Sequence, residues 1–171
     1  LKNIAVMPNC QQKGYGKRMI DFLLSTGIRV GELVRLNIDD IDFSERECVV
    51  YGKGDKERKA YFDAKTKIHL LNYIESRTDN NIALFVSLNK PHSRLTESSV
   101  ELRLREMGKK LGVEKVHPHK FRRTMATRAI EKGMPIEQVQ KILGHEQIDT
   151  TLRYAMVNQN NVKLSHRKYI S

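Results

Sequence analysis

The chain has 171 residues, 31 of them Lys or Arg and 20 of them Asp or Glu, which gives a formal net charge of +11 and a sequence pI of about 9.7. This length suits one domain of ordinary size and excludes two full domains. Apolar residues make up 39% of the chain, too many for a disordered basic tail. No run approaches the ~20 apolar residues of a membrane span, and no leader sequence opens the chain, so we expect a cytoplasmic protein that does not enter a membrane.

The excess of positive charge is concentrated in the C-terminal part. Residues 1–100 contain 16 basic and 13 acidic residues, whereas residues 101–171 contain 15 basic and 7 acidic residues. A polyanion is one natural partner for such a surface, because neutralised phosphates release their counterions. A well-solvated surface rich in Lys is the other interpretation. Cys10 and Cys48, in a chain without a CxxC pair, predict reduced thiols rather than a disulfide or a zinc site.

The first half of the chain predicts helices around one β-hairpin. Apolar spacing, β-rich runs and the position of Gly residues define the expected elements. The first two are a strand at 2–7 and a helix that ends at Gly27 and buries Met19, Ile20, Leu23 and Leu24. A helix at 29–37 and hairpin strands at 48–51 and 60–62 around a Gly-rich tip follow. The last is a helix at 66–77 with Ile68, Leu71 and Ile74 on one face.

The second half predicts more helices. A strand-like run at 82–88 is followed by a helix after an N-cap at Thr96, with Val100, Leu104, Met107 and Leu111 on one face. The next helix runs from Pro118 to Gly133 with Phe121, Met125 and Ala129 inward. A further helix has Pro135 in its first turn, buries Val139, Ile142 and Leu143 and stops at Gly144, and a helical stretch runs from Thr150 or Thr151 through Tyr154. The predicted fold class is mainly α with a small antiparallel β-sheet (α+β).

Four short motifs follow one another along the chain. They are TGIRVGEL with Arg29, GKG with Lys53, HKFR with His119 and Arg122, and LGH with His145, which is followed nine residues later by Tyr154. Each residue by itself is most often structural, as an Arg in a surface ion pair, a Lys that protects a sheet edge, or a His or Tyr in a core. His119 lies three residues before Arg122, so on a helix both side chains project from one face.

In this order the six residues resemble the catalytic pattern of the tyrosine recombinases, the integrases and transposases of bacterial mobile elements. The resemblance covers the chain from about residue 22 to its end, and it implies the catalytic domain fold of that family over residues 23–171. It also implies site-specific cleavage and rejoining of DNA by transesterification through a 3′-phosphotyrosyl intermediate. Because the bond energy is kept in that intermediate, the resemblance implies no cofactor and no metal ion.

The resemblance implies a role for each residue of the pattern. The two arginines, whose guanidiniums stay charged, would hold the non-bridging phosphate oxygens. Tyr154 would be the nucleophile, and because a phenol has an ordinary pKa of about 10 it needs a base or a cationic site. His119 would be that base, Lys53 would protonate the leaving 5′ oxygen from a mobile hairpin tip, and His145 would donate a hydrogen bond to the phosphate.

Double-stranded DNA is the expected partner. Lys56 and Arg58 at the hairpin tip, together with Arg123, are the expected DNA-binding residues outside the pattern. Arg123 lies four residues after His119, so the choice of Arg122 as the catalytic arginine rests on the resemblance and not on periodicity. As in the family, the tail after Tyr154 is expected to pack on its own domain or to associate with a second copy on DNA.

Two other interpretations remain open at this point. Residues 119–143 can be interpreted as a helix-turn-helix, with Gly133 and Pro135 between two amphipathic helices, which would make the protein a DNA-binding regulator without catalysis. That interpretation leaves Arg29, Lys53 and the arrangement around Tyr154 unexplained. The chain can also be an inactive recombinase remnant.

The first 22 residues depart from the recombinase pattern, which normally has a helical core-binding domain before the TGxRxxEL motif. IAVMPNCQQKGYGKRMIDFL resembles the acetyl-coenzyme-A-binding segment of GNAT acetyltransferases, through Gln11, Gly14 and Gly16 before a helix N-terminus. The segment can come from a gene fusion, can be an ordinary recombinase helix, or can bind coenzyme A. We favour the fusion, place a GNAT-like fragment at 1–22, and expect neither acetyltransferase activity nor bound acetyl-coenzyme A. Its helix is expected to cover the core beneath TGIRVGEL.

Overall fold

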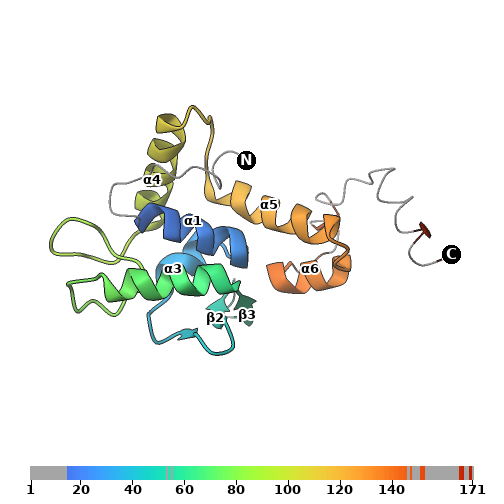
Figure 1. Ribbon diagram of the computed structural model, residues 1–171, viewed down its shortest axis with the longest axis horizontal. Helices are drawn as coiled ribbons and strands as arrows, with labels where there is room; N and C mark the ends of the chain where they lie inside the picture. Colours follow the sequence, from blue (N-terminus) through green and yellow to red (C-terminus); the bar gives the residue numbers. More distant parts are fainter. Residues whose placement is uncertain are drawn as a thin grey trace.

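In a computed structural model of the chain, the described residues are 15–52, 54, 56–145, 147, 151–152, 166–167 and 170. The strand expected at 2–7 and the end of the helical stretch expected at Tyr154 lie outside them. The elements in chain order are α1 (Tyr15–Thr26), α2 (Val30–Arg35), β1 (Ile41–Asp42), β2 (Glu47–Tyr51), β3 (Glu57–Tyr61), α3 (Ala64–Glu75), α4 (Glu97–Lys110), α5 (Pro118–Glu131) and α6 (Ile136–Leu143) (Figure 1).

The strands form one antiparallel sheet in the order β1-β2-β3. In the expected hairpin, β2 pairs with β3 so that Cys48 lies opposite Ala60 and Val50 lies opposite Arg58. Side chains alternate across a strand, and Cys48, Val50 and Ala60 are all buried on the helical side of the sheet. The expected fold class, mainly α with a small antiparallel sheet, is confirmed.

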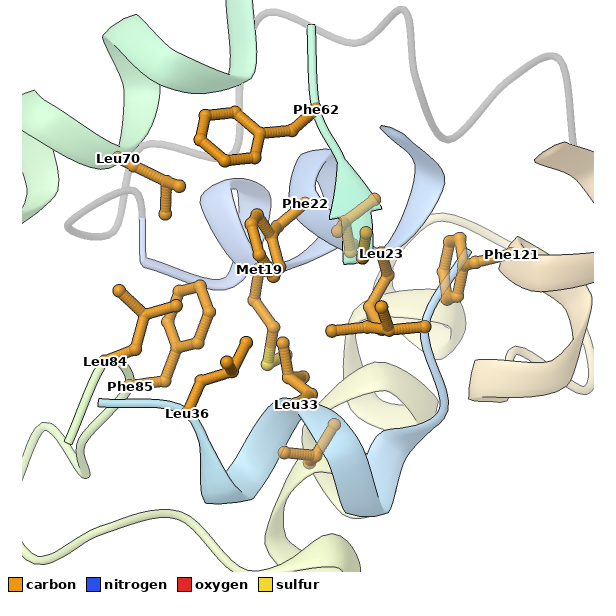
Figure 2. Packing of buried hydrophobic residues seen from close by; sticks show 14 of the residues in the cluster. Met19, Phe22, Leu23, Leu33, Leu36, Phe62, Leu70, Leu84, Phe85 and Phe121 are labelled. Carbon is orange, nitrogen blue, oxygen red and sulfur yellow. The ribbon is translucent and has the colours of Figure 1, made fainter. Parts of the chain in front are cut away.

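Helix α1 lies at the centre of the core, packed against α3 and α5 (Figure 1). Met19, Phe22 and Leu23 are at most 2% exposed and meet apolar side chains from α2, α3 and the 82–88 segment (Figure 2). The helix runs through residue 22, where the GNAT-like fragment was expected to end. It stops as predicted at Gly27, whose φ of 65° is in the left-handed region that favours glycine.

Helix α3 buries a different face from the predicted one. Of the predicted face, Ile68 and Leu71 are 57% and 41% exposed and only Ile74 packs against the core, whereas Leu70 and Tyr73 are fully buried. The Tyr73 ring stacks on Phe85 at 5.4 Å between centroids, and its hydroxyl accepts a hydrogen bond from the Val86 amide at 3.3 Å. Apolar residues occur around much of this helix, so its contact with the 82–88 segment, and not its period, decides which face is buried.

The run at 82–88 is an irregular segment, buried at 83–86, with two isolated bridges, Asn37 with Ala83 and Val86 with Arg94, and is not a strand of the sheet. The Leu84 amide donates to the Leu36 carbonyl oxygen at 2.8 Å, next to the end of α2. Arg94 donates to the carbonyl oxygens of Val34 and Leu36 at 2.9 and 3.0 Å. These bonds fix the C-terminal end of α2, the short helix that Arg29 precedes.

The remaining helices begin and end near the predicted residues. Thr96 caps α4, accepting a hydrogen bond from the Ser99 amide at 3.2 Å, as predicted. Pro135 is the N-cap of α6 and not part of its first turn, so the helix begins one residue later than expected. Gly144 ends α6 in the left-handed conformation, as predicted, with φ at 62°.

None of the helices in the described ranges is long and apolar enough to cross a membrane. The cytoplasmic location stays a prediction.

Candidate active site

Arg29 stands immediately before α2, held by the carboxylate of Glu32. Glu32 accepts from the Arg29 backbone amide at 2.7 Å through Oε2 and from Nη1 of Arg29 at 2.9 Å through Oε1. Nη2 of Arg29 also donates to the carbonyl oxygen of Gly144, at 3.2 Å. The Glu32 side chain is only 3% exposed, whereas that of Arg29 is 40% exposed. A buried carboxylate therefore orients a guanidinium that faces solvent.

The motif did not predict that Glu32 holds Arg29. Its position three residues after Arg29, with the helix beginning between them, was the available signal, because an acidic side chain at that position accepts from the N-cap amide.

Arg122 joins the ends of two helices. Its Nη1 donates to the Gly27 carbonyl oxygen at 2.6 Å, just after α1, and its Nη2 donates to the carbonyl oxygen of Leu143, the last residue of α6. Helix C-termini carry partial negative charge, so each favours a cation. Arg122 is 4% exposed, whereas its neighbour Arg123 is exposed on the outer side of α5.

His145 lies on the turn that both arginines bind. Its Nδ1 lies 2.8 Å from the Thr151 hydroxyl, and its carbonyl oxygen accepts from Gln140 at 3.1 Å. The pKa of His145 is lowered to about 4, first by burial and then by the charges of Arg122, Arg29 and Arg58. The imidazole is therefore neutral at neutral pH, and one of its ring nitrogens carries a proton that it can donate.

Two adjoining pockets bring these side chains together. A pocket of about 420 Å³ is lined by Arg29, His119 and Arg122, with Glu32 behind them. A second pocket, of about 850 Å³, is lined by Arg29, Gly144 and His145. Arg29 and Gly52 line both. Four residues of the predicted pattern thus surround one region. Arg29 lies before α2, His119 and Arg122 near the start of α5, and His145 after α6.

The other predicted residues have different surroundings. Lys53 and Tyr154 lie outside the described residues, although Gly52, which lines both pockets, directly precedes Lys53. Lys56 is exposed and lines the second pocket. Arg58 belongs to β3 rather than to the hairpin tip, and its side chain is 13% exposed and paired with Glu32. Its role as a DNA contact stays a prediction.

The site combines the guanidiniums of Arg29 and Arg122 with the imidazoles of His119 and His145. Two guanidiniums and a neutral imidazole can bind non-bridging phosphate oxygens, and His119 is exposed at the mouth of the first pocket. Within the described part of the chain, no group of three or more His, Cys, Asp or Glu side chains is placed to hold a metal ion.

Comparison with known proteins identifies relatives of the chain. The model of the phage integrase family matches residues 3–161. The chain is 36% identical over 150 residues to a tyrosine recombinase XerC of Staphylococcus aureus (85% of this chain, 50% of that protein) and 38% identical over 154 residues to a XerC of Leptospira interrogans (89% and 50%). The chain therefore spans about half the length of these curated relatives.

Solved structures share the fold. The crystal structure of XerA recombinase superposes with a TM-score of 0.74 at 33% identity, covering 95% of this chain and 65% of that one. The XerH site-specific recombinase bound to its difH substrate superposes with a TM-score of 0.72 at 24% identity, covering 92% of this chain and 48% of that one.

The family match corrects one interpretation of the N-terminus. It begins at residue 3 and so includes the segment that resembles an acetyltransferase, and the expected gene fusion is not supported. Core packing of α1 against α3 and α5 agrees with a helix that is an ordinary part of the domain. The comparisons give no support to the helix-turn-helix regulator.

Proposed function

Because the chain belongs to the phage integrase family, the tyrosine recombinases, we propose that it cuts and rejoins double-stranded DNA through a 3′-phosphotyrosyl intermediate. The observation that carries this proposal is the convergence of Arg29, His119 and Arg122 on one pocket, with His145 on the adjoining turn. These residues come from three segments that are far apart in the sequence.

In the proposed reaction a scissile phosphate enters between the two guanidiniums. Arg29 and Arg122 hold its non-bridging oxygens and stabilise the charge that accumulates there in the pentacoordinate transition state. Glu32 and the helix ends that Arg122 binds keep both guanidiniums in place before DNA arrives. The neutral imidazole of His145 donates one further hydrogen bond.

Proton transfers accompany the exchange of bonds. The Tyr154 hydroxyl oxygen attacks phosphorus and gives its proton to His119, while the bond from phosphorus to the 5′ oxygen breaks. Lys53 gives a proton to that oxygen, which leaves as a free 5′ hydroxyl. Rejoining is the reverse sequence with a new 5′ hydroxyl, so the number of phosphodiester-type bonds does not change.

The proposed partner is double-stranded DNA, with Lys56 and Arg123 as exposed contacts to the flanking backbone. The similar structures of XerH and of the Tn1549 transposon integrase hold bound DNA, which supports this choice. Self-association through the tail after Tyr154 is a further part of the proposal.

A covalent-trapping experiment tests the function. The full chain is incubated with nicked suicide duplexes that carry a randomised central sequence, and the products are separated on a denaturing gel. We expect a protein–DNA adduct with the wild type and none with Tyr154→Phe, which keeps the ring and removes the nucleophile. A wild type that forms no adduct, like Tyr154→Phe, would identify an inactive remnant.

Arg29→Ala separates a recombinase from a regulator. We expect this variant to retain most of its DNA affinity and to lose adduct formation by at least ~10²-fold, the usual effect of removing a charged transition-state contact. Equal cleavage by Arg29→Ala and the wild type would contradict the assignment of the pocket.

A further inference from the structure

We infer that Arg58 is a positioning residue of the cleavage site: by pairing with Glu32 and packing against Gly144, it fixes Arg29 and the turn that carries His145. The inference rests on the proposed function, because it adds a residue to the same reaction. It differs from the role in DNA binding that the sequence suggests for Arg58.

The Arg58 side chain is directed into the fold. Residues 58 and 60 lie on the same face of β3, and Ala60 is fully buried. Arg58 is accordingly directed inward, towards α6, which packs against β3, and its side chain is 13% exposed. Lys59, the next residue, is directed outward, with a side chain 57% exposed and paired with Glu47. From this inner face Arg58 lines the second pocket together with Arg29 and His145.

Glu32 links Arg58 to Arg29. Nη2 of Arg58 donates to Oε2 of Glu32 at 2.7 Å, the oxygen that also accepts from the Arg29 backbone amide. The other oxygen of the same carboxylate holds Nη1 of Arg29. The two guanidiniums together compensate the buried carboxylate of Glu32. Loss of either one leaves the Glu32 charge less well compensated at a position that is only 3% exposed to solvent. Arg58 thereby supports the carboxylate that orients Arg29.

Arg58 also contacts the turn after α6. A Cβ atom at Gly144 would lie 2.6 Å from Nε and 2.7 Å from Cδ of Arg58, so the Arg58 side chain covers the Gly144 Cα. Gly144 also accepts from Arg29, and His145 follows it. Nε and Nη1 of Arg58 are buried, and neither has a hydrogen-bond partner among the described residues. The guanidinium is therefore held by Glu32 and packs directly against the glycine turn.

Arg58→Gln tests the inference, with Lys59→Gln as the matched control, because both variants remove one positive charge from β3. Both are measured in single-turnover adduct formation with the nicked duplexes and in DNA binding by fluorescence anisotropy. We expect Arg58→Gln to lower the rate at saturating DNA at least tenfold and to change the dissociation constant no more than Lys59→Gln does. A rate defect that disappears at saturating DNA would make Arg58 a DNA contact and would overturn the inference, as would a wild-type rate.

Two further variants show whether Arg58 acts through Glu32. Arg58→Lys keeps a cation that can reach the carboxylate of Glu32, and we expect its rate to lie between those of Arg58→Gln and the wild type. If Arg58→Gln does not fold, the rate of Arg58→Lys is compared with that of the wild type alone, and a wild-type rate would contradict the inference. The double variant Arg58→Gln, Glu32→Gln is expected to be no slower than the slower single variant. Independent, multiplicative defects in the double variant would contradict a shared role.

A spectroscopic measurement keeps the inference separate from the proposed function. The arginine side-chain resonances of the ¹⁵N-labelled protein report the order of Arg29 without DNA or cleavage. We expect the Arg29 guanidinium signals to be dispersed in the wild type and in Lys59→Gln, and to move to the solvent-averaged position in Arg58→Gln. Unchanged Arg29 signals in Arg58→Gln overturn the inference, whether or not the wild type forms an adduct.

Discussion

Arg122 and Arg123 are neighbours on α5, yet the fold gives them opposite surroundings. The first is buried and bonded to the carbonyl oxygens of Gly27 and Leu143, and the second is exposed. The arginine expected to bind phosphate is thus also a structural clamp between the ends of α1 and α6. A residue placed in this way couples the geometry of the site to the stability of the domain.

The pair Arg122→Lys and Arg123→Lys tests this coupling. A Lys at 122 cannot donate from two separated nitrogens, so one buried carbonyl oxygen loses its partner, and we expect the free energy of unfolding to fall by roughly 1–3 kcal/mol. Arg123→Lys should lie within about 0.5 kcal/mol of the wild type, as for exposed substitutions. Urea denaturation measures both variants. Equal stabilities of the two would show that Arg122 does not clamp the helix ends.

His145 makes the stability of the domain depend on pH. Its pKa of about 4 in the folded chain lies below the ordinary value of 6.5, so between these values the unfolded chain binds a proton that the folded chain excludes. The contribution is complete above pH 6.5 and is lost as the pH falls towards 4. Because the ring is partly exposed to solvent, we expect the loss between pH 7 and 4.5 to be only about 1 kcal/mol.

The measurement for His145 is urea unfolding of the wild type and His145→Gln at both pH values. Glutamine keeps a donor and does not titrate, so the variant should lack this part of the pH dependence while retaining that of the other groups. Parallel curves for the two proteins would exclude His145 as the source.

At the scale of the elements, local signals predicted where helices begin and end better than which side they bury. Thr96 and Gly144 predicted two helix ends correctly because each acts locally, Thr96 through its side-chain oxygen and Gly144 through its left-handed backbone conformation. On α3 the apolar residues surround the helix, and the buried face depends on Phe85, which is distant in sequence. The inward direction of Arg58 was equally hard to predict from the sequence. Its one local signal is that residues 58 and 60 lie on the same face of β3.

The site could be predicted in part for a similar reason. The order of the motifs identified Arg29, His119, Arg122 and His145, which the structure brings to adjoining pockets. The supporting contacts could not be predicted, because the carbonyl oxygens of Gly27, Leu143 and Gly144 carry no side-chain signal. Their role follows from how three helix ends meet in the fold.

Leu70 and Leu71 provide a matched test of the face that α3 buries. Both are leucines in the middle of one helix, with exposed fractions of 0% and 41%. Leu70→Ala should lower the free energy of unfolding by roughly 2–4 kcal/mol, since it opens a cavity in the core, and Leu71→Ala should cost under about 1 kcal/mol. Chemical denaturation decides between them. A larger loss with Leu71→Ala would restore the face predicted from the sequence.

At the scale of the whole molecule, positive charge has two separate positions. Part of it lies inside the site, where Arg29, Arg58 and Arg122 surround the end of α6. Much of the rest lies on the surface of the C-terminal part, which has 15 basic and 7 acidic residues. The exposed basic residues of α4, α5 and the segments that follow them include Arg105, Lys109, Lys110, Lys115, Arg123 and Arg128.

These two groups of charges should respond differently to salt. Surface charges bind DNA by releasing counterions, so with about six phosphate contacts the affinity should fall roughly 10³-fold between 50 and 200 mM salt. The cleavage rate at saturating DNA should change less than about threefold over the same range, because charges in a partly dry pocket are screened much less. Anisotropy titrations and single-turnover cleavage over one salt series measure both quantities. An affinity that does not depend on salt would show that the excess of surface basic residues does not contact the phosphate backbone. A cleavage rate at saturating DNA that falls as steeply as the affinity would show that the charges of the pocket are screened like those of the surface.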